Sequence, residues 1–213
     1  MKYTFLHTHA QSEKCIIFFG GFATQAAHFA HLSADCDVIM VYDYRDFVLP
    51  QAFFDSLASY KMLYLIAFSM GVSIAPHFIS TFNLHRKIAI NGTNIGIDRH
   101  FGIHPLVFKK TISHLNVPDF KTALFGTQSD MPLSPKDKLQ AELQSLYNYA
   151  LNKPHLQDFS YDVAFLSLND KIFPFSASKV FFDSRIPPVR IVESPAPHFA
   201  FLAFQSWEEI CTI

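Results

Sequence analysis

The feature that most constrains this 213-residue chain is a serine between an apolar run and a segment of helical character. Residues 63–66 read Leu-Tyr-Leu-Ile, and residues 67–71 read Ala-Phe-Ser-Met-Gly. A serine on a sharp strand-to-helix turn needs small residues two positions before and after it, because larger side chains would clash. Gly71 meets this need and Ala67 adds one methyl group. The pattern predicts that Ser69 is a nucleophile, with an ordinary helix cap as the alternative.

Two further residues follow in the order that such a nucleophile requires. The strand-like residues 163–168 precede Asp170, and the strand-like residues 189–192 precede His198. A serine, an acid and a histidine in this order, each after a strand, are typical of the α/β-hydrolase fold. We therefore expect Asp170 to be the acid and His198 the base. Asp98 and Asp162 remain alternatives for the acid.

An early glycine pair predicts the site that binds the developing negative charge. Residues 16–19 form a buried apolar run, and Gly-Gly-Phe-Ala-Thr follows at residues 20–24. In this fold one backbone donor follows the early strand and the other follows the nucleophile. We expect the N–H groups of Phe22 and Met70 to form the oxyanion hole. Gly21 and Phe22 are also the residues expected to contact substrate.

Short apolar segments alternate with helical segments along the chain. This pattern favours a mostly parallel sheet with helices on both faces. Strands are expected at residues 3–6, 15–19, 38–42, 63–68, 87–91, 163–168 and 189–192. Helices are expected at residues 24–32, 51–59, 70–82, 176–182 and 199–210.

The stretch from about residue 93 to residue 160 interrupts the alternation. It lacks an obvious strand and is far longer than an ordinary connection. Helical periodicity and initial prolines predict helices at residues 105–115, 118–125 and 135–151. We expect one α/β-hydrolase domain over residues 1–213, with this insertion as a lid over the active site.

Composition excludes several classes of protein. The formal net charge of −1 argues against a nucleic-acid binder. No apolar run has the length of a membrane span and no amino-terminal segment reads as an export signal. Cys15, Cys36 and Cys211 have no metal-site spacing, and His7 with His9 lacks a third ligand. We expect a cytoplasmic enzyme that needs no cofactor or metal.

Three motifs carry a resemblance to a known family. They are Phe-Gly-Gly-Phe-Ala-Thr at residues 19–24, Tyr-Asp-Tyr-Arg-Asp at 42–46 and Ile-Ala-Phe-Ser-Met-Gly-Val at 66–72. The chain resembles the pimeloyl-[acyl-carrier protein] methyl ester esterases of biotin synthesis, of the compact stand-alone type. Phe22 stands where a tryptophan is frequent in such enzymes.

The resemblance implies a serine carboxylesterase that releases methanol from the methyl ester of pimeloyl-acyl-carrier protein. It places the nucleophile at Ser69, the acid at Asp170 and the base at His198, and it makes an acyl carrier protein the partner. A general short-acyl esterase or thioesterase is the alternative activity, and a non-catalytic binding protein is a third possibility.

Two surface features stay open at this level. The expected lid carries basic residues that would steer an acidic carrier protein or would simply form a solvated face; they are Arg99, Lys109, Lys110, Lys121, Lys136 and Lys138. Asp43 and Tyr44 either end a strand in a turn or support the site.

Overall fold

Seven apolar runs pair into a single twisted sheet in the computed structural model, which describes residues 1–213 except 128, 154–155 and 157. The order across the sheet is β1-β3-β2-β4-β5-β6-β7. The strands are β1 Lys2–His7, β2 Lys14–Phe19, β3 Asp37–Tyr42, β4 Met62–Phe68, β5 Leu84–Ile90, β6 Val163–Ser167 and β7 Arg190–Ser194. Only β1 is antiparallel to its neighbour among these pairs. The expected mostly parallel sheet is confirmed.

The central strands are apolar along their whole length because both of their faces are buried. On β2, Ile17 and Phe19 point to one hydrophobic cluster, and Ile16 and Phe18 point to the other. Burial of both faces is the usual state of a parallel sheet whose crossover connections place helices on each side. It also explains why the strands could be recognised from short runs of apolar residues.

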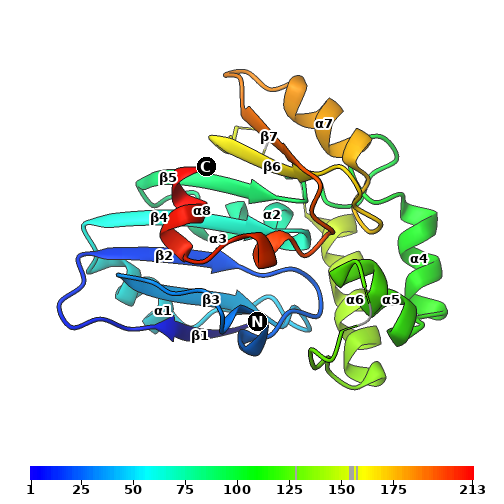
Figure 1. Cartoon of the computed structure of the whole chain (residues 1–213), viewed down its shortest axis with the longest axis horizontal. Coiled ribbons are helices and arrows are strands. Elements are labelled where there is room, and N and C mark those ends of the chain that lie inside the picture. Colours follow the sequence, from blue (N-terminus) through cyan, green and yellow to red (C-terminus); the bar gives the residue numbers. More distant parts are fainter. Residues whose placement is uncertain (128, 154–155, 157) are drawn as a thin grey trace.

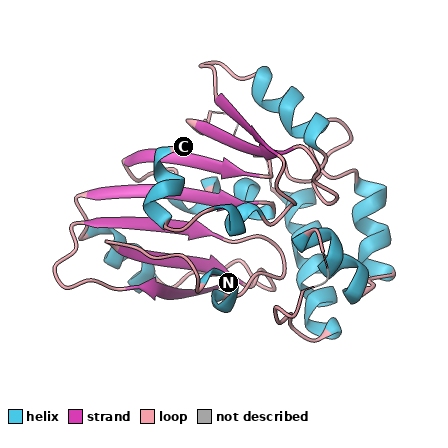
Figure 2. Cartoon of the chain, viewed as in Figure 1, coloured by secondary structure: helices cyan, strands magenta, loops and turns pink. Residues whose placement is uncertain are grey.

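Helices cover both faces of the sheet (Figure 2). The helices are α1 Gln51–Ala58, α2 Met70–Ile74, α3 Pro76–Ile79, α4 Pro105–Ser113, α5 Val117–Phe125, α6 Lys136–Asn152, α7 Phe175–Asp183 and α8 Trp207–Thr212, with short 3-10 turns η1 Ala26–Phe29 and η2 Ala200–Ala203. Apolar residues of α1, α2, α3 and α7 join one cluster, and those of η1, η2 and α8 join the other. In the described part of the chain, the helices are each too short or too polar to cross a membrane.

Three expected helices are shorter in the structure. The helix expected at residues 24–32 is only η1, because Thr24 closes a turn onto the Gly21 carbonyl and Gln25 is extended. The helix expected at 70–82 is divided into α2 and α3 where Pro76 lacks an amide donor. The helix expected at 199–210 is broken between η2 and α8, where Ser33 binds the backbone of Gln205.

The long connection between β5 and β6 carries α4, α5 and α6, which gather at one end of the molecule (Figure 1). The arrows of the central parallel strands point toward these helices. Helices α4 and α6 pack together, with the rings of Phe108 and Tyr147 stacked at 6.1 Å. We call α4–α6 the helical insertion. It stands beside the carboxyl ends of the parallel strands, which is where α/β folds bind their ligands.

Candidate functional site

Ser69 is held in a strained turn at the end of β4. Its backbone has φ 54° and ψ −124°, and α2 begins at the next residue. A non-glycine residue at positive φ is costly and persists only where the surrounding structure enforces it. A Cβ added at Gly71 would come within 2.5 Å of the Gly20 carbonyl oxygen. The turn requires a small residue two positions after the serine because a larger side chain at Gly71 would clash with the backbone.

The structure brings Ser69, Asp170 and His198 together from three strand ends. His198 Nε2 lies 3.0 Å from Ser69 Oγ, and His198 Nδ1 lies 2.6 Å from Asp170 Oδ2. The other carboxylate oxygen, Asp170 Oδ1, accepts the amide N–H groups of Ile172 and Phe173, each at 2.8 Å. The three side chains are thus joined by one series of hydrogen bonds. In the tautomer with the proton on Nδ1, Nε2 is free to accept the serine proton.

The alternative acids lie elsewhere. Asp98 Oδ1 accepts the amides of His100 and Phe101 in a local turn. Asp162 precedes β6, at the opposite end of that strand from Asp170, and its carboxylate binds the backbone and side chain of Lys87. Neither aspartate contacts His198 in the described contacts, so Asp170 is the acid that the geometry supports.

A buried asparagine that was not recognised from the sequence connects the acid and histidine loops. Asn91 follows β5, and its Nδ2 donates to Ser167 Oγ at 2.8 Å and to the His198 carbonyl at 2.7 Å. Its Oδ1 accepts the Ser167 amide at 2.7 Å, while Ser167 Oγ donates to the Pro197 carbonyl at 2.9 Å. One side chain therefore ties the end of the acid-bearing strand to the loop that carries His198.

The predicted oxyanion residues lie at the same place. Phe22 and Met70 line the cavity that Ser69 and His198 also line. Gly21, predicted to contact substrate, lies against the nucleophile strand: a Cβ there would come within 2.9 Å of Ser69 Cβ. The glycine loop is closed by Thr24, whose Oγ1 donates to the Gly21 carbonyl at 2.8 Å.

Tyr44, whose role was open, supports this loop. Its side chain is buried, and its hydroxyl donates to the Gly20 carbonyl at 2.6 Å. Asp43 lies at the turn and forms two 2.6 Å hydrogen bonds with Arg45. The sequence left two roles open for Tyr44, a strand-end turn or support of the site. The hydrogen bond to Gly20 favours support of the site.

A cavity of about 500 Å³ opens from Ser69 into the helical insertion. Much of its wall is apolar: Phe22, Met70, Ile103, Phe108, Leu115, Phe120, Leu124, Leu143 and Ile172. Its exposed polar members are Lys110, His114, Asn116, Asp119 and Lys171. The arrangement can hold an apolar chain next to the serine and a charged group beside the exposed polar side chains.

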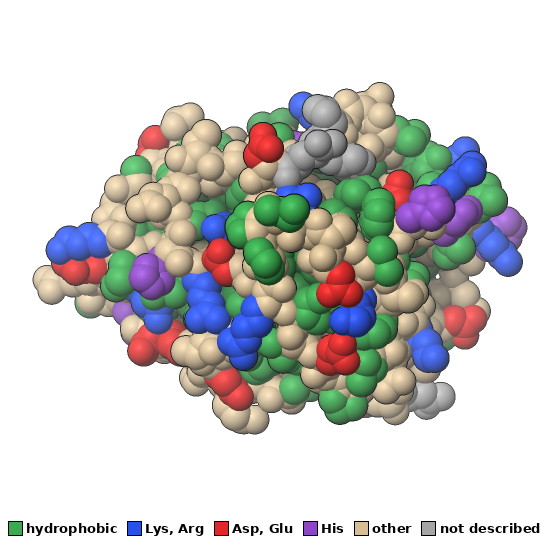
Figure 3. Space-filling model, turned by 90° about the horizontal axis from the view of Figure 1, so that it is seen from above, with side chains coloured by type: hydrophobic (Ala, Val, Ile, Leu, Met, Phe, Trp, Pro, Cys, Tyr) green, Lys and Arg blue, Asp and Glu red, His purple; other side chains and the backbone are tan. Residues whose placement is uncertain are grey.

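The basic residues of the insertion occupy different places. Lys110 lines the cavity, whereas the Lys109 ammonium lies 5.5 Å from the centre of the Tyr147 ring. Lys138 lines a second cavity beside Glu142. Most histidine side chains in view lie at the end of the molecule that carries the insertion, with Lys or Arg side chains beside them, and other Lys or Arg side chains lie along the rest of this face (Figure 3).

One group of possible metal ligands lies outside this site. Ligand atoms of Asp35, Cys36 and Glu208 lie within 4.8 Å of one another among the described residues. The Cys36 thiol donates to Glu208, and the Lys14 ammonium lies 3.7 Å from Asp35 and 3.9 Å from Glu208. Burial raises the pKa of the Cys36 thiol to about 12, which keeps it protonated. These groups already satisfy one another.

Comparison with known proteins identifies the family. The family described as pimeloyl-ACP methyl esterase BioG matches residues 1–210. The crystal structure of BioG from Haemophilus influenzae superposes with a TM-score of 0.86 at 27% identity, covering 99% of each chain. A malonyl-[acyl-carrier protein] O-methyltransferase from Bacteroides fragilis is 32% identical over 177 residues, which are 76% of this chain and 35% of that protein.

More distant structures agree on the fold. A structure described as a putative aryl esterase from Burkholderia cenocepacia has a TM-score of 0.65 at 13% identity, covering 94% of this chain and 88% of the other. The resemblance noted from three sequence motifs is confirmed by a match over nearly the whole chain. The chain belongs to the pimeloyl-ACP methyl esterase family and has the α/β-hydrolase fold.

Proposed function

We propose that Ser69 attacks the methyl ester of pimeloyl-acyl-carrier protein, with His198 as the base and Asp170 as the acid. Hydrolysis of this ester in biotin synthesis is the reaction of the family to which the chain belongs. The observation that best supports the residue assignment is His198 placed between Ser69 Oγ at 3.0 Å and Asp170 Oδ2 at 2.6 Å. Ser69 and His198 lie on the wall of a cavity of about 500 Å³, which has room for an acyl chain.

The chemistry follows from the hydrogen bonds that join Ser69, His198 and Asp170. His198 Nε2 takes the hydroxyl proton as Ser69 Oγ attacks the ester carbonyl, and the Asp170 carboxylate stabilises the imidazolium. The N–H groups of Phe22 and Met70 bind the oxyanion; each such donor typically contributes about 10²–10³ in rate. His198 then gives its proton to the leaving methoxide, so methanol departs. Water hydrolyses the pimeloyl-serine ester by the same steps with the roles reversed.

Substrate orientation follows from the cavity. The methyl ester is at the end of the acyl chain away from the carrier, so it must enter first and reach Ser69. The apolar wall accommodates the methylene chain, while the carrier stays outside. Exposed Lys110 and Lys171 lie at the mouth and carry charge opposite to that of an acidic carrier protein. The insertion thus acts as a lid that receives the carrier.

The methyltransferase relative fits this reaction. Its name describes a transferase that methylates a malonyl group on an acyl carrier protein. An enzyme of that class makes a carrier-bound methyl ester, and an esterase of the present class removes the methyl group later. A carrier-bound substrate is made and used inside the cell, so the cytoplasm is the proposed compartment.

The test is to incubate pimeloyl-acyl-carrier protein methyl ester with the wild-type protein and with Ser69→Ala, and to follow loss of the methyl group by mass spectrometry. We expect the wild type to release methanol and leave the carrier thioester intact. Ser69→Ala should lose several orders of magnitude in rate with an unchanged melting temperature. Ser73→Ala, on the same helix, is the matched control and should keep its activity.

Two results would contradict the proposal. Appreciable turnover by folded Ser69→Ala would remove the serine mechanism. Release of the free carrier thiol in place of methanol would show that the thioester is cleaved, which is the alternative activity left open by the motifs.

A further inference from the structure

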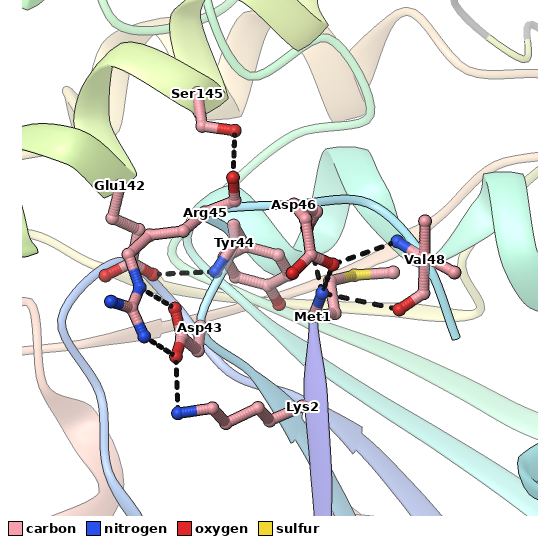
Figure 4. Close-up of polar contacts among 9 residues, drawn as sticks. All are labelled: Met1, Lys2, Asp43, Tyr44, Arg45, Asp46, Val48, Glu142 and Ser145. Carbon is pink, nitrogen blue, oxygen red and sulfur yellow. Dashed lines mark hydrogen bonds and ion pairs between the residues drawn. The ribbon is translucent and has the colours of Figure 1, made fainter. Parts of the chain in front are cut away.

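Helix α6 of the insertion packs apolar residues into the main core and also carries one buried carboxylate. Glu142 is 7% exposed, and its Oε1 accepts the Tyr44 amide N–H at 3.2 Å (Figure 4). Ser145, on the same side of α6, donates its Oγ to the Arg45 carbonyl at 3.2 Å. The helix therefore contacts the loop after β3 through an acceptor and a donor, both directed at the backbone.

The same carboxylate lies beside the glycine loop that carries Phe22. Ala23, which follows Phe22, lines one cavity together with Glu142 and has a positive φ of 66°. On the other side of this loop the Tyr44 hydroxyl donates to the Gly20 carbonyl at 2.6 Å. Glu142 thus lies near the backbone directly after Phe22 and binds the amide of the tyrosine that supports the start of the loop.

Among the described contacts, Glu142 forms no ion pair with a lysine or an arginine. Arg45 is committed to Asp43 through two 2.6 Å bonds, and Lys2 lies 3.0 Å from the same aspartate. Lys138, from α6, is exposed and shares with Glu142 the lining of a cavity of about 340 Å³. The carboxylate has one hydrogen-bond partner in the described part of the chain, the Tyr44 amide.

Such a carboxylate is easily protonated. Burial and the nearby Asp43 raise the pKa of Glu142 to about 7, against the lowering effect of the Tyr44 and Ala23 amides and of Arg45. The cavity beside it gives water access to the group. Below neutral pH the carboxyl is neutral and holds the Tyr44 amide less strongly, because hydrogen bonds to a charged acceptor are roughly twice as strong.

We propose that Glu142 is a positioning residue for the oxyanion hole, so that the Phe22 N–H is correctly placed only while α6 is seated on the sheet. This rests on the esterase reaction proposed above. It couples the lid to catalysis: when α6 moves away, the Tyr44 amide loses its acceptor and the Tyr44 hydroxyl no longer holds the Gly20 carbonyl in place. Formation of the oxyanion hole then requires a seated lid.

The test compares Glu142→Gln with Ser145→Ala using p-nitrophenyl acetate, a small ester that needs no carrier. Gln keeps the size of the side chain and removes the charge. We expect kcat of Glu142→Gln to fall about tenfold with KM within about twofold, less than the loss of a whole oxyanion donor. Ser145→Ala breaks the neighbouring helix-to-loop bond and should keep kcat within about twofold.

The pH profile separates this role from general support of the fold. Wild-type kcat should fall below neutral pH in part because Glu142 is protonated there. Glu142→Gln should lack that part of the fall. If Glu142→Gln does not fold, Glu142→Asp is the second variant. Its carboxylate is shorter in reach by one methylene group, and it should show the same selective loss of kcat.

Several outcomes would overturn the inference. These are wild-type kcat in a folded Glu142→Gln or Glu142→Asp protein, an equal loss in Ser145→Ala, or an unchanged pH profile. A wild-type protein inactive on every ester would instead overturn the proposed function, and this inference with it.

Discussion

At the scale of single residues, backbone strain gathers around the site. Four of the five described non-glycine residues with positive φ follow the ends of parallel strands, namely Ala23, Asp43, Ser69 and Asn91; the fifth is Gln11. Each non-glycine residue in such a sparsely populated region costs on the order of 1–3 kcal/mol. Ser69 is the proposed nucleophile, Ala23 follows a proposed oxyanion donor, and Asn91 ties the strand before Asp170 to the loop of His198. The strain is retained where side chains and amides have to be presented at defined angles.

Asn91 provides a prediction at this scale. Asn91→Ala leaves the Ser167 amide and the His198 carbonyl without their buried partner, and alanine tolerates positive φ less well than asparagine. We expect a loss of about 2–4 kcal/mol in the free energy of unfolding. We also expect kcat to fall roughly 10- to 100-fold, because Asp170 and His198 are no longer held in register. Urea denaturation and ester kinetics measure the two effects.

Asn169→Ala is the matched control. Asn169 lies beside Asp170 and also reaches the histidine loop, but it is exposed and its single bond to the Pro195 carbonyl is 3.4 Å long. It should keep its stability within about 1 kcal/mol. If both variants behave alike, the Asn91 network has no special role.

The proposed catalytic residues and the residues that support them differ in how far the sequence indicates them. A local turn motif and a fixed chain order point to Ser69, Asp170 and His198, and the structure brings these three side chains together. Asn91 contacts residues 76 and 107 positions away, and Glu142 contacts a residue 98 positions away. No local pattern records such pairings, so these residues emerge only from the folded chain.

At the scale of elements, the strands and the helices differed in how well they could be predicted. All seven strands occur close to their expected positions; burial on both faces gives an unbroken apolar run in the central strands, whereas β1 and β7 are only partly buried. The segments at residues 24–32 and 199–210 were each expected to be one helix, yet the first forms only η1 and the second is divided between η2 and α8. Both lie beside the site, where Thr24 closes the glycine loop and His198 must face Ser69. Tertiary contacts there override helical preference.

The strand-to-helix turn supplies a prediction at this scale. Gly71→Ala places a methyl group within 2.5 Å of the Gly20 carbonyl oxygen and closer still to that of Phe19. Backbone cannot move aside as a side chain can, so we expect a loss of at least about 2 kcal/mol. For a chain of this size the melting temperature should fall by roughly 4–8 °C. Calorimetry of Gly71→Ala beside Ser73→Ala checks this, and an unchanged melting temperature would mean that the turn is looser than the structure indicates.

At the scale of the whole molecule, the sheet carries the proposed catalytic residues and the helical insertion carries much of the proposed recognition surface. Ser69, Asp170 and His198 all follow strands, whereas much of the cavity wall comes from α4, α5 and α6. The basic side chains at the mouth stand on the insertion and on the loop after β6. Changes in carrier recognition should therefore be separable from changes in catalysis.

The surface charge of the lid provides the last prediction. Lys110 is exposed and lines the cavity, so reversing it to glutamate opposes an acidic carrier at the mouth. Charges at the rim of an interface act mainly on association, and salt screens them over about 8–10 Å. We expect Lys110→Glu to raise KM for the carrier-bound ester and to weaken the salt dependence of kcat/KM, while p-nitrophenyl acetate turnover stays within about twofold. Lys136→Glu, equally exposed at the start of α6 but outside the cavity lining, is the control. Equal losses with both esters would mean that the substitution disturbs the lid itself, and equal effects of the two lysines would mean that overall charge, rather than the cavity mouth, attracts the carrier.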